Sequence, residues 1–142
     1  AVLLGAEDLT ADLEVARTKE GDEIFYARTK IAYACKAHKV DAIDTPFSDI
    51  NDEEGLIKDT EIGKGLGMTG KAVINPRQID IINKIFLPTL EEIEYAKDLL
   101  EAAEKAKNEG KGVFSFKGKM VDAPIIHRAE TILKKAKLGG LI

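Results

Sequence analysis

The feature that most constrains this chain is a regular alternation of short apolar runs with longer amphipathic segments. Residues 1–4, 40–45 and 71–74 are apolar runs of strand length. Residues 23–38, 51–67 and 75–87 carry apolar side chains at helical spacing. Strands that alternate with helices pair in parallel through right-handed crossovers, so this order predicts an α/β fold.

Capping residues mark where the helices begin. Asn51 with Glu54 three positions later predicts one start, and Asn75 followed by Pro76 predicts another. The first strand, residues 1–4, is expected to be fully buried. Residues 5–22 are polar and are expected to be irregular. Cys35 is the single cysteine and is expected to be a small buried residue.

The second part of the chain has a different pattern. Pro88 ends the preceding helix, and Thr89 with Glu92 predicts a capping box for a long helix over 90–109. Residues 113–116 and 119–121 predict a hairpin, and Pro124 begins a last helix. Asp122, just before that helix, is either a cap or a catalytic group. We therefore expect two parts, residues 1–88 and residues 89–142.

Composition excludes several classes of protein. The chain has 142 residues, 44% hydrophobic and 32% charged, with a net charge of −4. This balance is typical of a globular protein and lacks the basic excess of a nucleic-acid binder. Its apolar runs are too short to span a membrane, and no secretory signal is visible. With one cysteine, the sequence favours a cytoplasmic protein.

Polar residues follow each expected strand. Glu7 and Asp8 come after the first strand, Asp44 ends the second, and Asn75 and Pro76 follow the third. The carboxyl ends of parallel strands meet at one edge, where α/β folds bind their ligands. Carboxylates without nearby His or Cys suit Mg²⁺ rather than Zn²⁺. The alternative is that these acids are cap and loop residues on a solvated edge.

Four sequence blocks resemble one enzyme family. They are GAEDLTADLEVART (5–18), AIDTPFSDINDEEG (42–55), GKAVINPRQI (70–79) and GKMVDAP (118–124). In order and spacing they resemble citrate lyase β subunits, within the Mg²⁺-dependent barrel lyases that also act on malyl-CoA and citramalyl-CoA. The resemblance implies the C-terminal part of a (β/α)₈ barrel, about strands 6–8, followed by a hairpin–helix extension.

The resemblance also implies roles for individual residues. Asp8 matches the family's magnesium-ligating aspartate, and Asp122 matches its acid–base aspartate. Asn75 and Pro76 lie in the block that contacts the thioester carrier arm, and Asp44, near the same rim, is a further candidate for contacting the substrate. The family's second metal ligand, a glutamate on an earlier strand, has no match here and is expected upstream of Ala1.

The implied reaction is cleavage of a citryl thioester to oxaloacetate and an acetyl thioester. The implied partners are an acyl-transferase α subunit, an acyl carrier γ subunit with a CoA-like arm, and further copies of the chain, as in family trimers. With one metal ligand, the 142 residues alone are expected to be inactive and to bind Mg²⁺ weakly. Two alternatives stay open: a lyase for malyl-CoA, citramalyl-CoA or another β-hydroxyacyl-CoA, and a non-catalytic half-barrel that serves as an assembly module.

Overall fold

The short apolar runs pair as parallel strands in the computed structural model, which describes all of residues 1–142. β1 (Val2–Leu3), β2 (Ala42–Asp44) and β3 (Gly70–Lys71) form one sheet in the order β1-β2-β3. Val2 lies opposite Ala42 in the β1–β2 pair, and Asp44 lies opposite Lys71 in the β2–β3 pair. The predicted α/β class and parallel pairing are confirmed.

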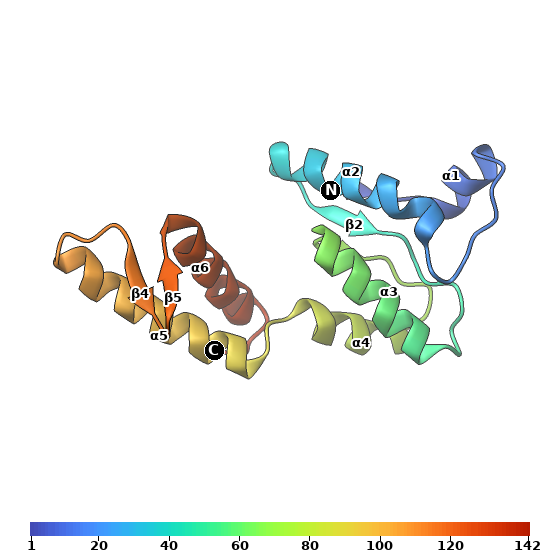
Figure 1. Ribbon diagram of the computed structural model, residues 1–142. Coiled ribbons are helices and arrows are strands. Elements are labelled where there is room, and N and C mark those ends of the chain that lie inside the picture. Colours follow the sequence, from blue (N-terminus) through green and yellow to red (C-terminus); the bar gives the residue numbers. More distant parts are fainter. The chain divides into compact units, whose positions relative to one another are not determined.

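Four helices accompany this sheet in a compact unit, Ala1–Phe86, called the N-terminal unit below. Their bounds are Ala6–Asp12 for α1, Asp22–Ala37 for α2, Glu53–Leu66 for α3 and Arg77–Phe86 for α4. Figure 1 shows α2 and α3 running beside β2. Buried side chains from α2, from the loop before β3 and from the residue that follows β1 make its main core, which includes Leu4, Ile24, Cys35 and Met68.

Two expectations for the start of the chain are wrong. The first part of the segment after β1 is not irregular, because α1 occupies residues 6–12, whereas residues 13–21 have no helix or strand, as expected. Ala6 and Thr10 are buried on one side of α1, and the Thr10 hydroxyl donates to the Ala6 carbonyl at 2.8 Å. The first strand is also not fully buried: Leu4 is covered, but Val2 and Leu3 are 43% and 56% exposed. β1 lies at the edge of the sheet and pairs only with β2, which leaves these two side chains open.

The start of α3 also differs from the prediction by one residue. The cap is Asp52, whose carboxylate accepts a hydrogen bond from the Gly55 backbone N–H at 2.8 Å. Asn51 instead belongs to the preceding turn, where its N–H donates to Asp49 at 3.2 Å. A Cβ on Gly55 would lie 2.7 Å from the Phe47 ring, so glycine permits this tight entry into the helix.

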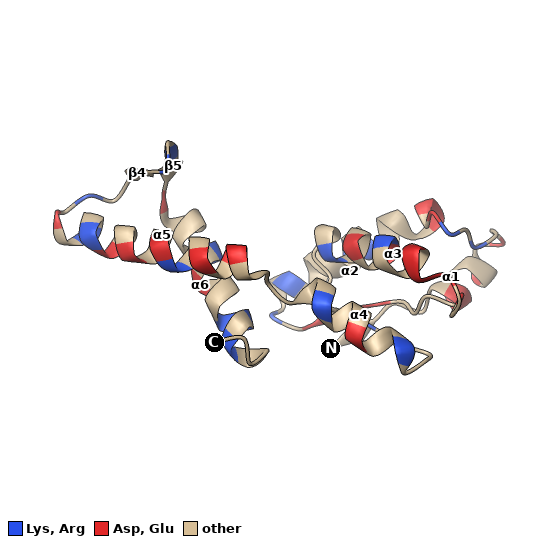
Figure 2. Ribbon diagram, turned by 90° about the horizontal axis from the view of Figure 1, so that it is seen from below, with Lys and Arg blue, Asp and Glu red and all other residues tan.

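The second compact unit, Leu87–Ile142, is called the C-terminal unit. It contains α5 (Leu90–Asn108), the hairpin of β4 (Phe114–Phe116) and β5 (Lys119–Val121), and α6 (Ala123–Leu138). The predicted capping box is confirmed, since Thr89 accepts from the Glu92 N–H and Glu92 accepts from the Thr89 N–H. Acidic and basic residues both occur along α5 (Figure 2), and Glu101 pairs with Lys105 at 2.7 Å.

The core of the C-terminal unit forms where α5, α6 and the hairpin meet. Ala96, Leu99, Val121 and Ala129 are its buried side chains. The hairpin turns at Lys117 and Gly118, which both have positive φ, as a two-residue turn with the twist of its strands requires. No helix in the structure is long and apolar enough to cross a membrane.

Candidate functional site

The candidate site lies at the carboxyl edge of the three-stranded sheet. Asp8 follows β1 in the first turn of α1, Asp44 ends β2, and Asn75 and Pro76 follow β3. Neighbouring parallel strands bring these segments to one edge of the N-terminal unit. Asp122 belongs to the C-terminal unit, so the candidate residues are divided between the two units.

Asp8 is an exposed carboxylate that makes no ion pair or side-chain hydrogen bond. A Cβ on Gly5 would lie 3.3 Å from Asp8 Oδ2, so glycine leaves room beside this carboxylate. The neighbouring Glu7 is held by Arg17, whose Nε donates to Glu7 Oε1 at 3.1 Å. No cluster of three or more His, Cys, Asp or Glu side chains is placed to hold a metal. Of the two acids that follow β1, Asp8 is thus the one whose carboxylate is free, and a single carboxylate is fewer ligands than a protein site for Mg²⁺ normally provides.

Arg17 connects α1 to the start of α2 through a second carboxylate, Glu23. Arg17 donates to Glu23 Oε1, and the Thr18 hydroxyl donates to Glu23 Oε2 at 2.7 Å. Partial burial raises the pKa of Glu23, but hydrogen bonds from the Thr18 hydroxyl and N–H and from Arg17 outweigh it and lower the pKa to about 2. These contacts fix the segment between α1 and α2 to Glu7 of α1 and to Glu23 of α2.

The expectation that Asp44 contacts a substrate is wrong, because the side chain is buried and already paired. Asp44 is 0% exposed, and both of its oxygens are bound inside the protein. Arg28 of α2 donates to it from Nε at 2.9 Å and from Nη2 at 3.0 Å, and Lys71 of β3 donates at 3.0 Å. Asp44 is therefore a buried structural carboxylate and is not available to bind a substrate.

Asp59 of α3 completes this buried charge cluster, which consists of Arg28, Asp44, Asp59 and Lys71. Arg28 Nη2 lies 2.6 Å from Asp59 Oδ1, and Lys71 Nζ lies 2.5 Å from Asp59 Oδ2. Burial lowers the pKa of Arg28, but the charges of Asp44 and Asp59 outweigh it and raise the pKa above its ordinary value. Two cations and two carboxylates balance, so the cluster joins α2, α3, β2 and β3 without net charge.

The charge cluster depends on close backbone approach and leaves one donor unsatisfied. A Cβ on Gly63 of α3 would lie 2.7 Å from Asp44 Oδ2, so only glycine fits against this carboxylate. Nη1 of Arg28 is buried and has no hydrogen-bond partner. Sequence reasoning missed this cluster. The available signal was Arg28 itself, which lies four residues after Ile24 on the apolar side of α2.

Asn75 and Pro76 lie in the turn that leads into α4. Asn75 is half-buried, and its Oδ1 accepts from the Arg77 backbone N–H at 3.0 Å. Gln78 is 3% exposed and joins this turn to the loop after β2. Its Nε2 donates to the Phe47 carbonyl at 2.9 Å, and its Oε1 accepts from the Ile74 N–H at 3.1 Å. Gln78 therefore fixes two rim loops relative to each other, a role that sequence reasoning did not identify.

A groove opens beside this turn. Its walls come from the loop after β2, the start of α3 and the start of α4, with Asp49, Ile50, Asp52, Arg77 and Ile81 among the lining residues. Lys19 reaches the same loop, where its Nζ lies 3.0 Å from Asp49 and 2.7 Å from Asp52. Hydrogen bonds from Lys19 lower the pKa values of both carboxyl groups.

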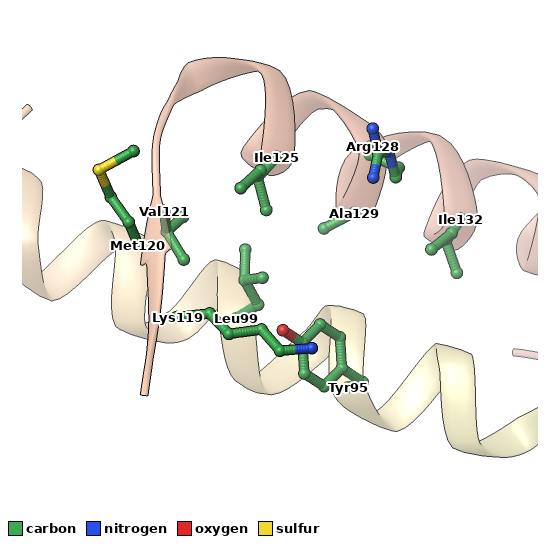
Figure 3. Close-up of a pocket in the computed structure, with 9 residues that line it drawn as sticks. All are labelled: Tyr95, Leu99, Lys119, Met120, Val121, Ile125, Arg128, Ala129 and Ile132. Carbon is green, nitrogen blue, oxygen red and sulfur yellow. The ribbon is translucent and has the colours of Figure 1, made fainter. Parts of the chain in front are cut away.

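Asp122 is the N-cap of α6 in the C-terminal unit. Its carboxylate accepts from the Ile125 backbone N–H at 3.4 Å, and the residue is half-buried. The capping role is therefore observed, and it leaves the second carboxylate oxygen uncommitted. The adjoining pocket, of about 200 Å³, is lined by residues of α5, β5 and α6, and Figure 3 shows Ile125 of α6 pointing toward Leu99 of α5.

The single cysteine and the two histidines lie outside the candidate site residues described above. Cys35 is 4% exposed in the core of the N-terminal unit, which confirms it as a buried small residue. His38 is the C-cap residue of α2. His127 is exposed on α6, where its Nδ1 lies 3.4 Å from Glu130.

Three comparisons relate this chain to known proteins. Residues 1–76 match the family described as HpcH/HpaI aldolase/citrate lyase. The chain is 46% identical to citrate lyase subunit beta of Haemophilus influenzae over 97% of its length, and 38% identical to mouse mitochondrial citramalyl-CoA lyase over 96%. It covers 47% and 40% of these two proteins, so it spans about half the length of the curated relatives it matches.

A solved structure gives the same relationship in three dimensions. The crystal structure of protein CitE from Mycobacterium tuberculosis, in complex with magnesium, acetoacetate and coenzyme A, superposes with a TM-score of 0.80 at 34% identity. The match covers 95% of this chain and 51% of the CitE chain.

Proposed function

Since the chain belongs to the HpcH/HpaI aldolase/citrate lyase family, we propose that it is part of a lyase that cleaves a citryl thioester to oxaloacetate and an acetyl thioester. The observation that carries this proposal is the 43–46% identity to citrate lyase subunit beta from several bacteria, over 97% or more of this chain. The free carboxylate of Asp8 at the carboxyl edge of the sheet supports it.

We place the N-terminal unit in the last part of a (β/α)₈ barrel, at about strands 6–8, with the C-terminal unit as its extension. Two features support this placement. The three parallel strands are connected by helices as in such barrels, and Val2 and Leu3 of the edge strand are exposed. Edge strands with open apolar side chains are normally covered by further strands or by another chain.

In this proposal Asp8 is the protein's first ligand to Mg²⁺. Its carboxylate is exposed and has no competing cation, and hard oxygen ligands are those that Mg²⁺ prefers. The crystal structure of CitE in complex with magnesium supports this cofactor. When bound, Mg²⁺ would stabilise negative charge on the substrate's hydroxyl oxygen as it becomes a ketone. A second protein ligand, a glutamate, would come from outside these 142 residues.

Asp122 is the proposed acid–base residue. Cleavage of the carbon–carbon bond leaves a thioester enolate, whose carbon must receive a proton. The carboxylate of Asp122 uses one oxygen to cap α6 and has the other free for this transfer. Asn75 and Pro76 are the proposed contacts for the thioester arm, in a turn that Gln78 holds in place.

The proposed partners are an acyl-transferase α subunit, an acyl carrier γ subunit and further copies of the chain, in a cytoplasmic complex. The identity to citrate lyase beta subunits supports a thioester carried by protein or by CoA. A second candidate function is cleavage of citramalyl-CoA or a related β-hydroxyacyl-CoA, which the 38% identity to citramalyl-CoA lyase favours. Assay of both thioesters with the full-length protein separates the two.

The Asp122→Asn variant of the full-length protein tests the mechanism. We expect turnover to be abolished while substrate binding is retained, because asparagine can still accept the Ile125 N–H but cannot donate the proton. Oxaloacetate release measures turnover, and calorimetric titration with a citryl thioester measures binding. The matched control is Asp98→Asn, an exposed α5 residue that pairs only with Lys117 at 3.2 Å. Near-normal turnover of Asp122→Asn would exclude the assignment.

A further inference from the structure

α2 carries an exposed aromatic and basic stripe that the proposed active site does not use. Tyr26 and Tyr33 are 73% and 72% exposed, and Lys30 lies between them with its Nζ 5.7 Å from the Tyr26 ring centre. Phe25, beside them, is 51% exposed. We propose that this stripe, called the α2 face, docks an acidic protein partner that delivers the thioester substrate. The inference rests on the proposed function and names a partner surface for it.

The α2 face points directly away from the core. Tyr26, Lys30 and Tyr33 follow one another at intervals of four and three, so they share one side of the helix. The buried residues Ile24, Arg28, Ala32 and Cys35 occupy the opposite side. Tyr26 and Tyr33 are among the most exposed large side chains of the chain, so no other part of the chain covers the α2 face.

Charge selects the kind of partner. From Ile24 to Val40 the sequence has no Asp or Glu, although the whole chain has a net charge of −4. Lys30, Lys36 and Lys39 are exposed along this segment, whereas the neighbouring α3 mixes both signs on its exposed side. Tyrosine is enriched among the central contacts of protein interfaces, and the lysines beside it give the α2 face its positive charge. An acidic protein surface, rather than a basic or neutral one, complements this face.

The position of the α2 face suits delivery to the rim. α2 begins after the chain has left the carboxyl end of β1 and ends just before the amino end of β2. Tyr26 therefore lies in the half of the helix nearer the edge that carries Asp8 and Asn75, and Lys30 lies near the middle of the helix. A carrier protein bound there would hold a flexible thioester arm on the same side of the N-terminal unit as the candidate site.

The experiment compares two substrates of the full-length protein: a citryl thioester on purified acyl carrier protein, and citryl-CoA. The Lys30→Glu and Tyr33→Ala variants are expected to raise KM for the carrier-linked substrate about tenfold, the usual scale for a central interface residue. KM and kcat for citryl-CoA should stay unchanged, because the small substrate needs no docking surface. Higher salt should raise KM for the carrier substrate alone. Lys58→Glu, on the exposed side of α3, is the matched control.

Direct binding of the carrier protein to the full-length protein, measured by titration, gives a readout independent of turnover. Binding that weakens in Lys30→Glu but not in Lys58→Glu supports the inference. The inference would be overturned by an equal loss of activity with both thioesters or by an unchanged KM for the carrier substrate. It would also be overturned if the carrier protein did not bind, or if the α2 face bound anionic lipid vesicles instead. Failure of the wild-type protein to cleave either thioester would instead contradict the proposed function, and the binding arm would still decide the docking surface.

Discussion

Replacing Arg28 with methionine should destabilise the N-terminal unit strongly. The Arg28 side chain is 1% exposed and makes three hydrogen bonds to carboxylates: two to Asp44, at 2.9 and 3.0 Å, and one to Asp59, at 2.6 Å. Methionine fills a similar volume but provides neither charge nor donors. Asp44 and Asp59 would then share a single cation, Lys71, in a buried site.

The expected loss is about 3–5 kcal/mol in the free energy of unfolding, the usual cost of removing one partner from a buried ion pair. This loss is reduced slightly because Nη1 of Arg28 is a buried donor without a partner, and methionine removes that unfavourable group. Arg28→Lys is the matched control. It retains the charge and loses the paired contact with Asp44, so it should cost less than Arg28→Met.

The assay is urea unfolding followed by far-ultraviolet circular dichroism, with the double variant Arg28→Met/Asp59→Asn as the decisive comparison. The double variant removes one charge of each sign and leaves the Asp44–Lys71 pair. Its loss should therefore be about 1–3 kcal/mol smaller than the two single losses together. Additive losses, or an Arg28→Met variant as stable as Arg28→Lys, would show that the buried cluster is not coupled as described.

Two further predictions concern local contacts. Thr89→Ala removes the cap of α5 and should lower the free energy of unfolding of the C-terminal unit by about 1 kcal/mol, measured by thermal unfolding. Thr131→Ala, an exposed helix-interior change, is its control, and equal effects of the two changes would contradict the capping role. The pKa of Glu23 is lowered to about 2, and its side chain is 12% exposed. Ionised Glu23 should therefore add at most about 3 kcal/mol to the free energy of unfolding, a contribution that is present above pH 4.5 and is lost as the pH falls toward 2. In Glu23→Gln the free energy of unfolding should depend less on pH in that range, whereas in Glu20→Gln its pH dependence should be unchanged. The same pH dependence of stability in both variants would contradict the hydrogen-bonded network around Glu23.

Regular periodicity made much of the fold predictable. The apolar runs and helical spacings located all three parallel strands and most helices, and the Thr89–Glu92 pair located the start of α5. α1 was missed because its seven residues give less than two turns of pattern, with only Ala6 and Thr10 buried. The α3 cap was misplaced by one residue because Asn51 and Asp52 both suit a cap. The local geometry at Gly55 decided between them.

The candidate site was less predictable because ion pairs depend on contacts between distant residues. Asp44 is the last residue of a strand and so lies at the same rim as the other candidates, yet its partners Arg28 and Lys71 lie 16 and 27 positions away. Periodicity does not show which carboxylates will be neutralised in this way. Asp8 is exposed and has no partner, whereas Asp44 is buried and paired within the charge cluster. This difference follows from the three-dimensional arrangement and could not be predicted from the sequence pattern.

The most direct test of the account is oxaloacetate release from a citryl thioester in the presence of Mg²⁺, measured in parallel for the full-length protein and for the 142-residue chain. We predict turnover by the full-length protein, loss of that turnover in Asp8→Ala, and none by the 142-residue chain, in which no three His, Cys, Asp or Glu side chains are grouped to hold a metal and the proposal provides Asp8 alone as a ligand. Comparable turnover by the 142-residue chain, or an unaffected Asp8→Ala variant, would contradict the proposed division of the active site.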